Sequence, residues 1–136
     1  MKNIESIKCT IADETDLINV RQAVRKLSSD IGFNLVDQTR LLTALSELCR
    51  NCLVHGGGGV VFICVLLEKK TGIQMIVCDN GPGIEDPDLA LKDGYTTNQG
   101  LGGIGLGGCK RLLDDLTIET HPGKGTQVTG IKYKSY

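Results

Sequence analysis

The sequence predicts an α+β two-layer sandwich, in which one mixed β-sheet is covered on one face by about three helices. The first observation is the order of expected elements, namely strand, two helices, two strands, loop and helix, and two strands. The second is the length, because 136 residues can bury one sizeable core without a disulfide or metal. We therefore expect a single domain that spans residues 1–136.

The N-terminal half is predicted to hold a strand and two helices. Residues 4–11 alternate between apolar and polar side chains, which is typical of a strand with one buried face. The first helix is expected from an N-cap at Asp13 to about Ile31, before Gly32, and the second from about Asp37 to Val54. The expected core stripes are Leu17, Val20, Val24, Leu27 and Ile31 on the first helix, and Leu41, Leu45, Leu48 and Cys52 on the second.

The C-terminal half is predicted to hold two hairpins, with a loop and a helix between them. Apolar runs bounded by turn residues indicate the strands, and helical spacing indicates the helix. The expected strands are 60–68 and 73–78, then 117–120 and 126–133, with turns at 69–72 and 122–125; the loop is 79–102, with a short helix near 87–92, and the third helix is 104–115.

Composition and charge exclude several classes of protein. The net charge is -1 and no basic arm is visible, so nucleic acid is not an expected partner. No apolar run approaches the roughly 18 residues that a membrane span needs. The N-terminal residues resemble neither a signal peptide nor a transit peptide, so we expect a cytoplasmic protein without a membrane segment.

The six cysteines are expected to be plain thiols. Five lie in apolar segments, and the C-x-x-C formed by Cys49 and Cys52 lies inside a helix without a second pair at zinc spacing. Buried thiols pack as small hydrophobic side chains. Cys109, beside a glycine-rich segment, is expected to be reachable by thiol reagents.

Glycine is over-represented, with 18 residues in 136 against an average usage of about 7%. The glycines form clusters at 56–59, 81–83, 100–108 and 123–125. Such clusters indicate places where the backbone bends sharply or approaches something closely.

Three polar residues of the second helix share one face. Glu47, Asn51 and His55 are spaced at i, i+4 and i+8, along the border of the apolar stripe. One interpretation is a solvated helix edge with an incidental histidine. The other is a site in which Asn51 offers an oxygen to Mg²⁺ and Glu47, one turn away, polarises a hydroxyl group or water.

Two further segments have both a structural and a functional interpretation. Asp79 ends an apolar strand, where its carboxylate is able to accept a hydrogen bond from an exocyclic amine, while Gly81 and Gly83 admit a flat base; an ordinary turn is the alternative. The segment 100–108 leads into a helix whose free N–H groups suit phosphate oxygens, although a flexible surface loop also explains it. It is neither a P-loop nor a Rossmann fingerprint.

Together these motifs resemble, in order and spacing, the nucleotide-binding pattern of the GHKL superfamily (gyrase, Hsp90, histidine kinase and MutL). Glu47-Leu48-x-x-Asn51-x-x-x-His55 resembles the N box, and Asp79-x-Gly81-x-Gly83 the first glycine box. Gly103-x-Gly105-Leu106 resembles the second glycine box, and Gly123-x-Gly125-Thr126 the third. The resemblance implies the Bergerat fold, with ATP and Mg²⁺ as cofactors.

The resemblance also implies residue roles. Glu47 is the expected catalytic base, Asn51 the expected Mg²⁺ ligand, and Asp79 the residue that reads the adenine amine. The segment 93–107 is expected to fold over the phosphates, and Thr126 to support the base pocket. The full set of implied nucleotide-binding positions is Asn51, His55, Asp79, Gly81, Gly83, Lys92, Gly103, Gly105, Leu106, Gly107 and Thr126.

Within the superfamily the chain resembles the small kinases of bacterial partner-switching systems, and the stressosome switch kinases more than the anti-sigma kinases. The stretches that carry this resemblance are 31–39, 89–96 and 110–112. It implies a serine or threonine of a STAS-domain protein as substrate, with a phosphatase activator as an alternative partner. The rival functions are an anti-sigma factor or nucleotide-gated regulator that sequesters a partner, and an ATPase or histidine-kinase-like catalytic domain.

One departure from the family concerns the cation for the γ-phosphate. The lid, residues 93–102, contains no arginine or lysine, unlike the basic lid of the anti-sigma kinases. The candidates that remain are Lys92, Lys110, Arg111 or a residue of the partner. Gly107 also departs from the serine or proline expected at the junction of lid and helix.

Overall fold

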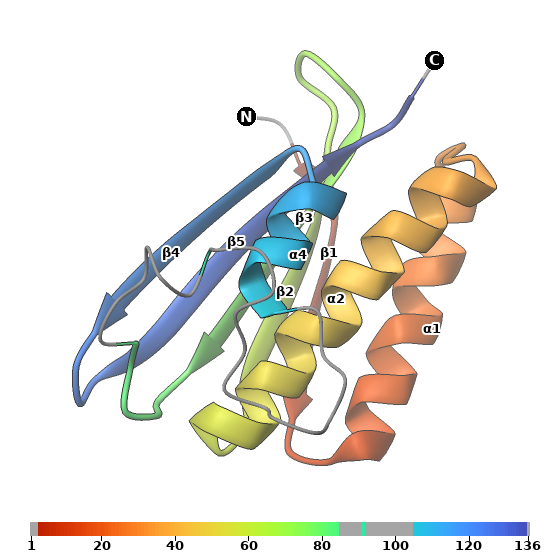
Figure 1. Cartoon of the computed structure of the whole chain (residues 1–136). Coiled ribbons are helices and arrows are strands. Elements are labelled where there is room, and N and C mark those ends of the chain that lie inside the picture. The colour runs from red at the N-terminus through yellow and green to blue at the C-terminus, as the bar shows by residue number, and fades with distance from the viewer. Residues whose placement is uncertain (1–2, 85–90, 92–104, 136) are drawn as a thin grey trace.

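The computed structural model describes residues 3–84, 91 and 105–135, with side chains from residue 6 onward. In this described part of the chain, three helices lie on one face of a single five-stranded sheet, so the predicted two-layer sandwich is confirmed (Figure 1). The elements are β1 (Asn3–Ile11), α1 (Glu14–Asp30), α2 (Leu35–Gly56), β2 (Gly59–Leu66), β3 (Gly72–Asp79), α4 (Gly105–Leu112), β4 (Asp115–His121) and β5 (Gly125–Tyr133). The short helix expected near 87–92 lies outside the described residues.

The sheet has the strand order β1-β2-β3-β5-β4, and all its neighbouring pairs are antiparallel. The expectation of a mixed sheet was therefore wrong. Two helices connect β1 to β2, so the chain returns to the end of the sheet that it left, and Ile11 pairs with Gly59. The connection from β3 to β4 contains the helix α4, but β5 lies between these two strands, so they form no parallel pair.

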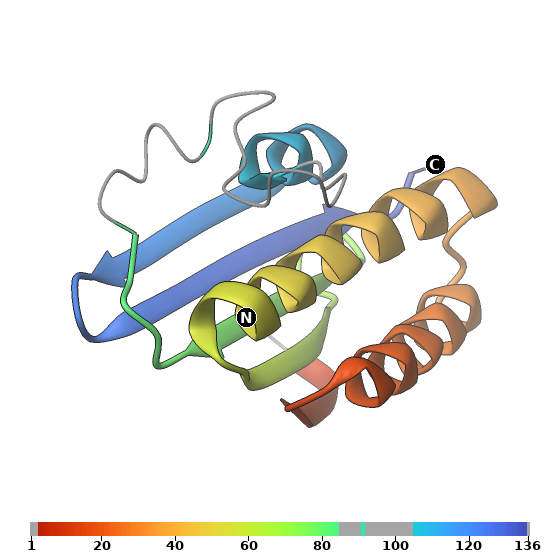
Figure 2. The same ribbon diagram turned by 60° about the horizontal axis from the view of Figure 1, so that its bottom comes forward.

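The helix α2 is the centre of the helical layer. It contacts α1 on one side and α4 on the other, as Figure 2 shows from a second direction. The residues of the predicted α2 stripe are all at most 2% exposed, and they pack against β2 and β3 residues such as Val61, Ile63 and Met75. No helix in the described part of the chain is long and apolar enough to cross a membrane.

Capping side chains set where the first two helices begin. Asp13 caps α1 as predicted, because its carboxylate accepts a hydrogen bond from the backbone N–H of Asp16 at 3.0 Å. The cap of α2 is Asn34, whose side-chain oxygen accepts from the N–H of Asp37 at 2.8 Å. Asp37 therefore lies in the first turn of α2, and the helix begins earlier than the sequence analysis expected.

The cysteines are free, and Cys49, Cys52 and Cys109 are buried. Cys109 packs on the inner face of α4 with its Sγ 3.8 Å from the carbonyl oxygen of Ala44, so the expectation that reagents reach it was wrong. Burial raises the pKa of Cys49 and of Cys109 to about 12 and that of Cys52 to about 11. Thiols that hold their protons so strongly behave as packing groups rather than nucleophiles.

A buried polar cluster ties the C-terminus to the start of α2. Asp37 accepts hydrogen bonds from the backbone N–H and hydroxyl of Ser135, at 2.9 and 3.1 Å. The ammonium group of Lys132 lies 3.5 Å from Asp37 and 3.2 Å from Asp114. Burial opposes ionisation of Asp37, but the bonds from Ser135 and the charge of Lys132 outweigh it, so the pKa of Asp37 falls below the ordinary value of 3.8.

The variant Asp37→Asn is expected to be less stable than the wild type at neutral pH. Because the pKa of Asp37 is lower in the folded state, its carboxylate stabilises the fold above the unfolded-state value of 3.8, and this contribution is lost as the pH falls through the folded-state value. The difference in free energy of unfolding between the wild type and the variant should become smaller below that pH, as measured by urea unfolding at a series of pH values. Asp30→Asn is the control, since Asp30 is exposed and its ion pair is with the exposed Lys26 of the same helix. A constant difference across the series would contradict the prediction.

Candidate nucleotide and phosphoryl-transfer site

The predicted site residues that the structure describes come from four elements. Glu47, Asn51 and His55 follow the second half of α2, and Asp79 is the last residue of β3. Thr126 opens β5 directly beside Asp79 in the strand register, and Gly105 begins α4 next to Glu47. The fold therefore brings segments from three separate parts of the sequence to the C-terminal half of α2 (Figure 2).

Glu47 is a buried carboxylate, only 3% exposed, and each of its oxygens has a partner. Oε1 accepts a hydrogen bond from the backbone N–H of Gly105 at 3.0 Å, and Oε2 accepts one from Nη1 of Arg50 at 3.4 Å. Gly105 has a φ of +70°, a left-handed conformation that glycine adopts without strain. Its N–H belongs to the first residue of α4, and the N-terminus of a helix stabilises negative charge.

Asn51 and His55 continue the face of α2 that begins at Glu47. Exposure increases along it, because Glu47 is buried, Asn51 half-buried and His55 exposed. No group of three or more His, Cys, Asp or Glu side chains that is able to hold a metal ion occurs among the described residues. A single amide oxygen such as that of Asn51 suits Mg²⁺ bound with a nucleotide, because this ion takes most of its other ligands from phosphates and water.

Asp79 is held in place by the strands on both sides of it. It pairs with Gly59 in β2 and with Thr126 in β5. Its Oδ1 accepts a hydrogen bond from the backbone N–H of Gly81 at 2.8 Å. Gly56, at the end of α2, packs so closely that a Cβ there would lie 2.4 Å from Asp79 Cγ. The position of this carboxylate is therefore determined by backbone packing.

The glycines of the first glycine box are required by packing within the chain. A Cβ on Gly81 would lie 2.6 Å from the Cα of Gly56, and one on Gly83 would lie 2.7 Å from the carbonyl oxygen of His121. Gly83 also has a φ of +82°. These contacts explain both glycines without a ligand, and their contact with a base remains a prediction.

Thr126 belongs to a chain of hydrogen bonds that closes this end of the sheet. Its hydroxyl lies 3.0 Å from that of Thr120, and Thr120 Oγ1 accepts from the backbone N–H of Ile84 at 2.8 Å. The N–H of Gly123 in turn donates to the carbonyl oxygen of Pro82. The β4–β5 hairpin thereby holds the segment that follows Asp79.

Replacing Gly125 by alanine is expected to destabilise the fold far more than replacing Gly123. Both have positive φ, but a Cβ on Gly125 would lie 2.1 Å from the carbonyl oxygen of Asp79, whereas nothing lies within 4 Å of one on Gly123. Gly123→Ala should cost about 1–2 kcal/mol, for the left-handed conformation alone. Gly125→Ala should cost roughly 1–3 kcal/mol more, for overpacking against backbone. Urea unfolding measures both, and equal losses would contradict the proposed contact with Asp79.

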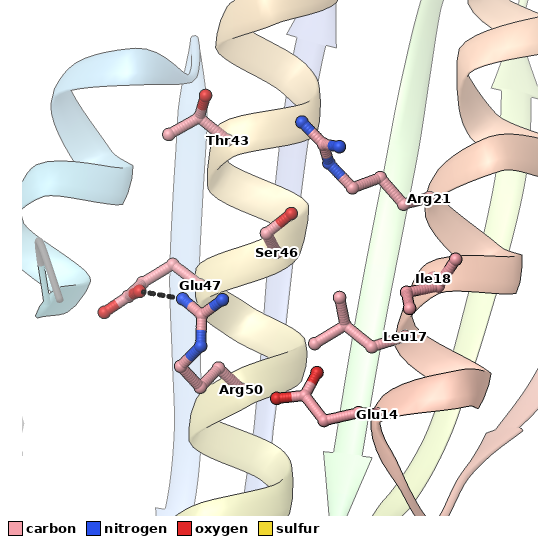
Figure 3. A pocket seen from close by; sticks show the side chains of 8 residues that line it. All are labelled: Glu14, Leu17, Ile18, Arg21, Thr43, Ser46, Glu47 and Arg50. Atoms are coloured by element: carbon pink, nitrogen blue, oxygen red, sulfur yellow. Dashed lines mark hydrogen bonds and ion pairs between the residues drawn. The ribbon is translucent and has the colours of Figure 1, made fainter. Parts of the chain in front are cut away.

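A groove of about 490 Å³ lies between α1 and α2, beside Glu47. Leu17, Ile18 and Arg21 line it from α1, and Ser46, Glu47 and Arg50 from α2. Figure 3 shows Arg50 reaching along α2 toward Glu47, while Arg21 extends from α1 toward α2. The Nε atom of Arg21 is buried and has no hydrogen-bond partner among the described residues.

Arg50, Gly56 and Thr120 contact predicted site residues but were not themselves among the predicted site residues. The signal for Arg50 was its position in the N box, three residues after Glu47. Gly56 belongs to the glycine cluster 56–59, but the sequence does not indicate that Asp79 is the group it approaches. Nothing in the sequence indicated Thr120.

The remaining predicted positions lie in α4 or outside the described residues. Lys92 and Gly103 lie outside the described residues. Leu106 and Gly107 are buried in α4, a helix that contacts α2. Lys110 and Arg111 occupy the last turn of α4, away from Gly105 at its start.

Comparison with known proteins agrees with this geometry. Residues 36–134 match the family model described as histidine kinase-, DNA gyrase B- and HSP90-like ATPase. The match covers most of the chain and includes Glu47, Asp79, Gly105 and Thr126. The protein belongs to this ATP-binding family, which is the GHKL superfamily that its motifs resemble.

Relatives narrow the class of enzyme. The chain is 40% identical over 124 residues to the serine/threonine-protein kinase RsbT of Bacillus subtilis (strain 168), covering 90% of this chain and 92% of the relative. It is 31% identical over 117 residues to an anti-sigma F factor of Thermoanaerobacter sp. (strain X514), covering 83% and 82%. The family and the first relative together define the class: an ATP-dependent protein serine/threonine kinase.

Solved structures support the fold. The crystal structure of the RsbU and RsbW domains of a Mycobacterium tuberculosis protein matches 98% of this chain and 34% of that one, with a TM-score of 0.68 and 20% identity. The SiaB–SiaC complex from Pseudomonas aeruginosa contains a chain that matches with a TM-score of 0.57 and 11% identity, over 96% of this chain and 90% of that one.

Proposed function

We propose that this kinase transfers the γ-phosphate of ATP to a serine or threonine of a STAS-domain protein, in a bacterial partner-switching pathway that controls a sigma factor. The observation that carries the proposal is the contact between Glu47 and Gly105, which joins a buried carboxylate to the start of the helix that follows the second glycine box. Similarity to the B. subtilis kinase and to anti-sigma F factors supports the proposal that the pathway controls a sigma factor.

In the proposed mechanism Glu47 is the general base. Glu47 is one of the residues that line the α1–α2 groove, and its carboxylate points toward the start of α4 (Figure 3). The residue therefore lies between the proposed entry of the acceptor and the proposed phosphate end of the site. A hydroxyl that enters through the groove would give its proton to Glu47 as it attacks phosphorus. The N–H groups at the start of α4 would stabilise the transferring phosphoryl group.

Asp79 and Asn51 are proposed to hold the nucleotide. Asp79 Oδ2 has no hydrogen-bond partner among the described residues, so it is able to accept a bond from the adenine amine while Gly81 holds Oδ1. Asn51 is half-buried, one turn beyond Glu47, and is the proposed protein ligand of Mg²⁺. The ion would neutralise phosphate charge when bound. Thr126, beside Asp79 in the sheet, is proposed to support the wall of the base pocket.

The α1–α2 groove suits a protein acceptor. Leu17 and Ile18 give it an apolar wall, and Ile18 is 52% exposed. The buried Nε of Arg21 lacks an acceptor among the described residues, and an unsatisfied buried donor is costly. Arg21 also lines the groove, so the terminal nitrogens of its guanidinium group are the proposed donors to a carbonyl or carboxylate of a docked partner.

The test is intact-mass analysis of STAS-domain proteins from the same genome, each incubated with this chain, Mg²⁺ and ATP. A gain of one phosphate on one of them, absent with the Glu47→Gln variant, is the expected result. Phosphorylation of unrelated proteins to the same extent would contradict the proposed substrate class.

A second candidate function is nucleotide-gated binding of a sigma factor, which the similarity to anti-sigma F factors favours. The same experiment separates the two. If every STAS protein stays unmodified while ATP still binds, the kinase proposal fails and the binding role gains support. Co-purification with sigma factors in the presence and absence of ATP would then be the next measurement.

A further inference from the structure

We infer that Arg50 is a positioning residue for Glu47, which it orients toward the acceptor hydroxyl. The inference rests on the proposed role of Glu47 as the base. It adds a residue that the motif pattern does not include, because Arg50 lies between Glu47 and Asn51 in sequence but belongs to neither predicted role. Its guanidinium group contacts the carboxylate oxygen Oε2 at 3.4 Å.

The two oxygens of Glu47 are held from opposite sides. Oε1 accepts from the backbone of Gly105, at the start of α4, and Oε2 accepts from Arg50, which lines the α1–α2 groove. One hydrogen bond leaves a carboxylate free to turn about its last bond, because this torsion is broad. A second bond on the other oxygen defines the plane of the group, and with it the direction in which its lone pairs face.

Burial makes this second bond matter. The side chain of Glu47 is 4% exposed and that of Arg50 is 38% exposed. A buried carboxylate needs hydrogen-bond partners, and without Arg50 the described residues supply only Gly105. Arg50 lies three residues after Glu47 on the same helix, so the pair remains together if α4 or α1 moves.

The geometry favours action through Glu47 over direct binding of the γ-phosphate. Arg50 uses one nitrogen on one oxygen, and this single contact at 3.4 Å is one that a lysine is able to replace. A phosphate clamp would use the two-pronged fork of arginine, which lysine does not reproduce. Because lysine also binds phosphate as a point charge, recovery of kcat by Arg50→Lys is read together with KM for ATP, which direct binding of the γ-phosphate would change.

The experiment compares Arg50→Met, Arg50→Lys and the control Arg40→Met, which changes an exposed arginine of the same helix. Transfer is measured with the phosphate acceptor found by the mass analysis, as kcat and as KM for ATP. Arg50→Met is expected to lower kcat by about 10- to 100-fold, because small misplacements of a catalytic group cost this much. KM for ATP should change less than about 2-fold, and Arg50→Lys should recover most of kcat.

The double variant Glu47→Gln/Arg50→Met provides the coupling test. If Arg50 acts through Glu47, its loss adds little to the residual rate of Glu47→Gln, and the effects are strongly non-additive. Independent effects that multiply, a raised KM for ATP, or full activity of Arg50→Met would each overturn the inference.

An NMR measurement that does not depend on phosphoryl transfer tests the role of Arg50 separately from the proposed function. The amide resonance of Gly105 in ¹⁵N NMR spectra reports its bond to Glu47, so it is expected to move in Arg50→Met and to stay in place in Arg50→Lys and Arg40→Met. An unmoved resonance in Arg50→Met would overturn the positioning role. Absence of phosphoryl transfer by the wild type would instead contradict the proposed function. The Gly105 resonance would still show whether Arg50 positions Glu47.

Discussion

Replacement of Glu47 by glutamine is expected to lower the rate of phosphoryl transfer by about 100- to 10,000-fold, the usual contribution of a general base. Glutamine has the same shape and keeps an oxygen for the N–H of Gly105, so the fold should survive. It has no basic site for the acceptor proton. Single-turnover transfer from ATP measures the loss.

Nucleotide affinity should be unchanged in this variant, because Asp79 lies on β3 and is held by its own neighbours in the sheet. Titration with a fluorescent ATP analogue tests this expectation. Glu119→Gln is the control, since Glu119 is an exposed carboxylate on β4. Normal transfer by Glu47→Gln would show that another group accepts the proton.

Replacement of Gly56 by alanine is expected to weaken ATP binding by about 10- to 100-fold, the worth of a hydrogen bond to a charged group. The new Cβ would lie 2.4 Å from Cγ and 2.5 Å from Cβ of Asp79. Asp79 cannot turn its Cβ aside without a shift of β3, which pairs with strands on both sides. The carboxylate that is proposed to read adenine must therefore be displaced.

The neighbouring Gly57→Ala is the matched control. A Cβ on Gly57 would meet nothing within 4 Å, although its φ of +71° makes alanine cost about 1–2 kcal/mol of stability. Gly57→Ala should therefore bind ATP normally while unfolding at lower urea. Within a helix, alanine is about 1 kcal/mol better than glycine, so weak binding by Gly56→Ala would not reflect a weaker helix. Wild-type affinity in Gly56→Ala would contradict the proposed adenine site.

Local patterns in the sequence predicted the elements well where periodicity and caps agree. The α2 stripe, the Asp13 cap and the α1 stripe from Leu17 to Leu27 are confirmed, because helical spacing of apolar residues reflects one buried face. Ile31 was wrongly included, since it is the half-buried C-cap residue of α1. The start of α2 was misplaced because Asn34 and Asp37 are both good caps, and only the hydrogen bond from the N–H of Asp37 to Asn34 distinguishes them. Cys109 was misjudged because glycine neighbours indicate a loop, whereas packing of α4 on α2 buries it.

The candidate site was predictable as a set of residue types but not as a set of contacts. Glu47, Asn51 and His55 follow from spacing on one helix, and Asp79 from its place at the end of a strand. The hydrogen bond from Gly105 to Glu47 could not be predicted in this way, because the donor is a backbone N–H and residue identity does not reveal it. The glycine cluster 56–59 predicted a close approach, but only the structure shows that Asp79 is the group beside Gly56.

By itself the sequence determined the order of the elements, the apolar faces that pair them and the motifs that place the chain in its ATP-binding family. These are local properties, read within one helix, strand or turn. Only the tertiary structure decided that the sheet is antiparallel throughout its described pairs, with β5 between β3 and β4. It also decided that the backbone N–H of Gly105 reaches Glu47. Both depend on which distant segments pack together, and that choice is made by the burial of the whole core rather than by any single stretch of chain.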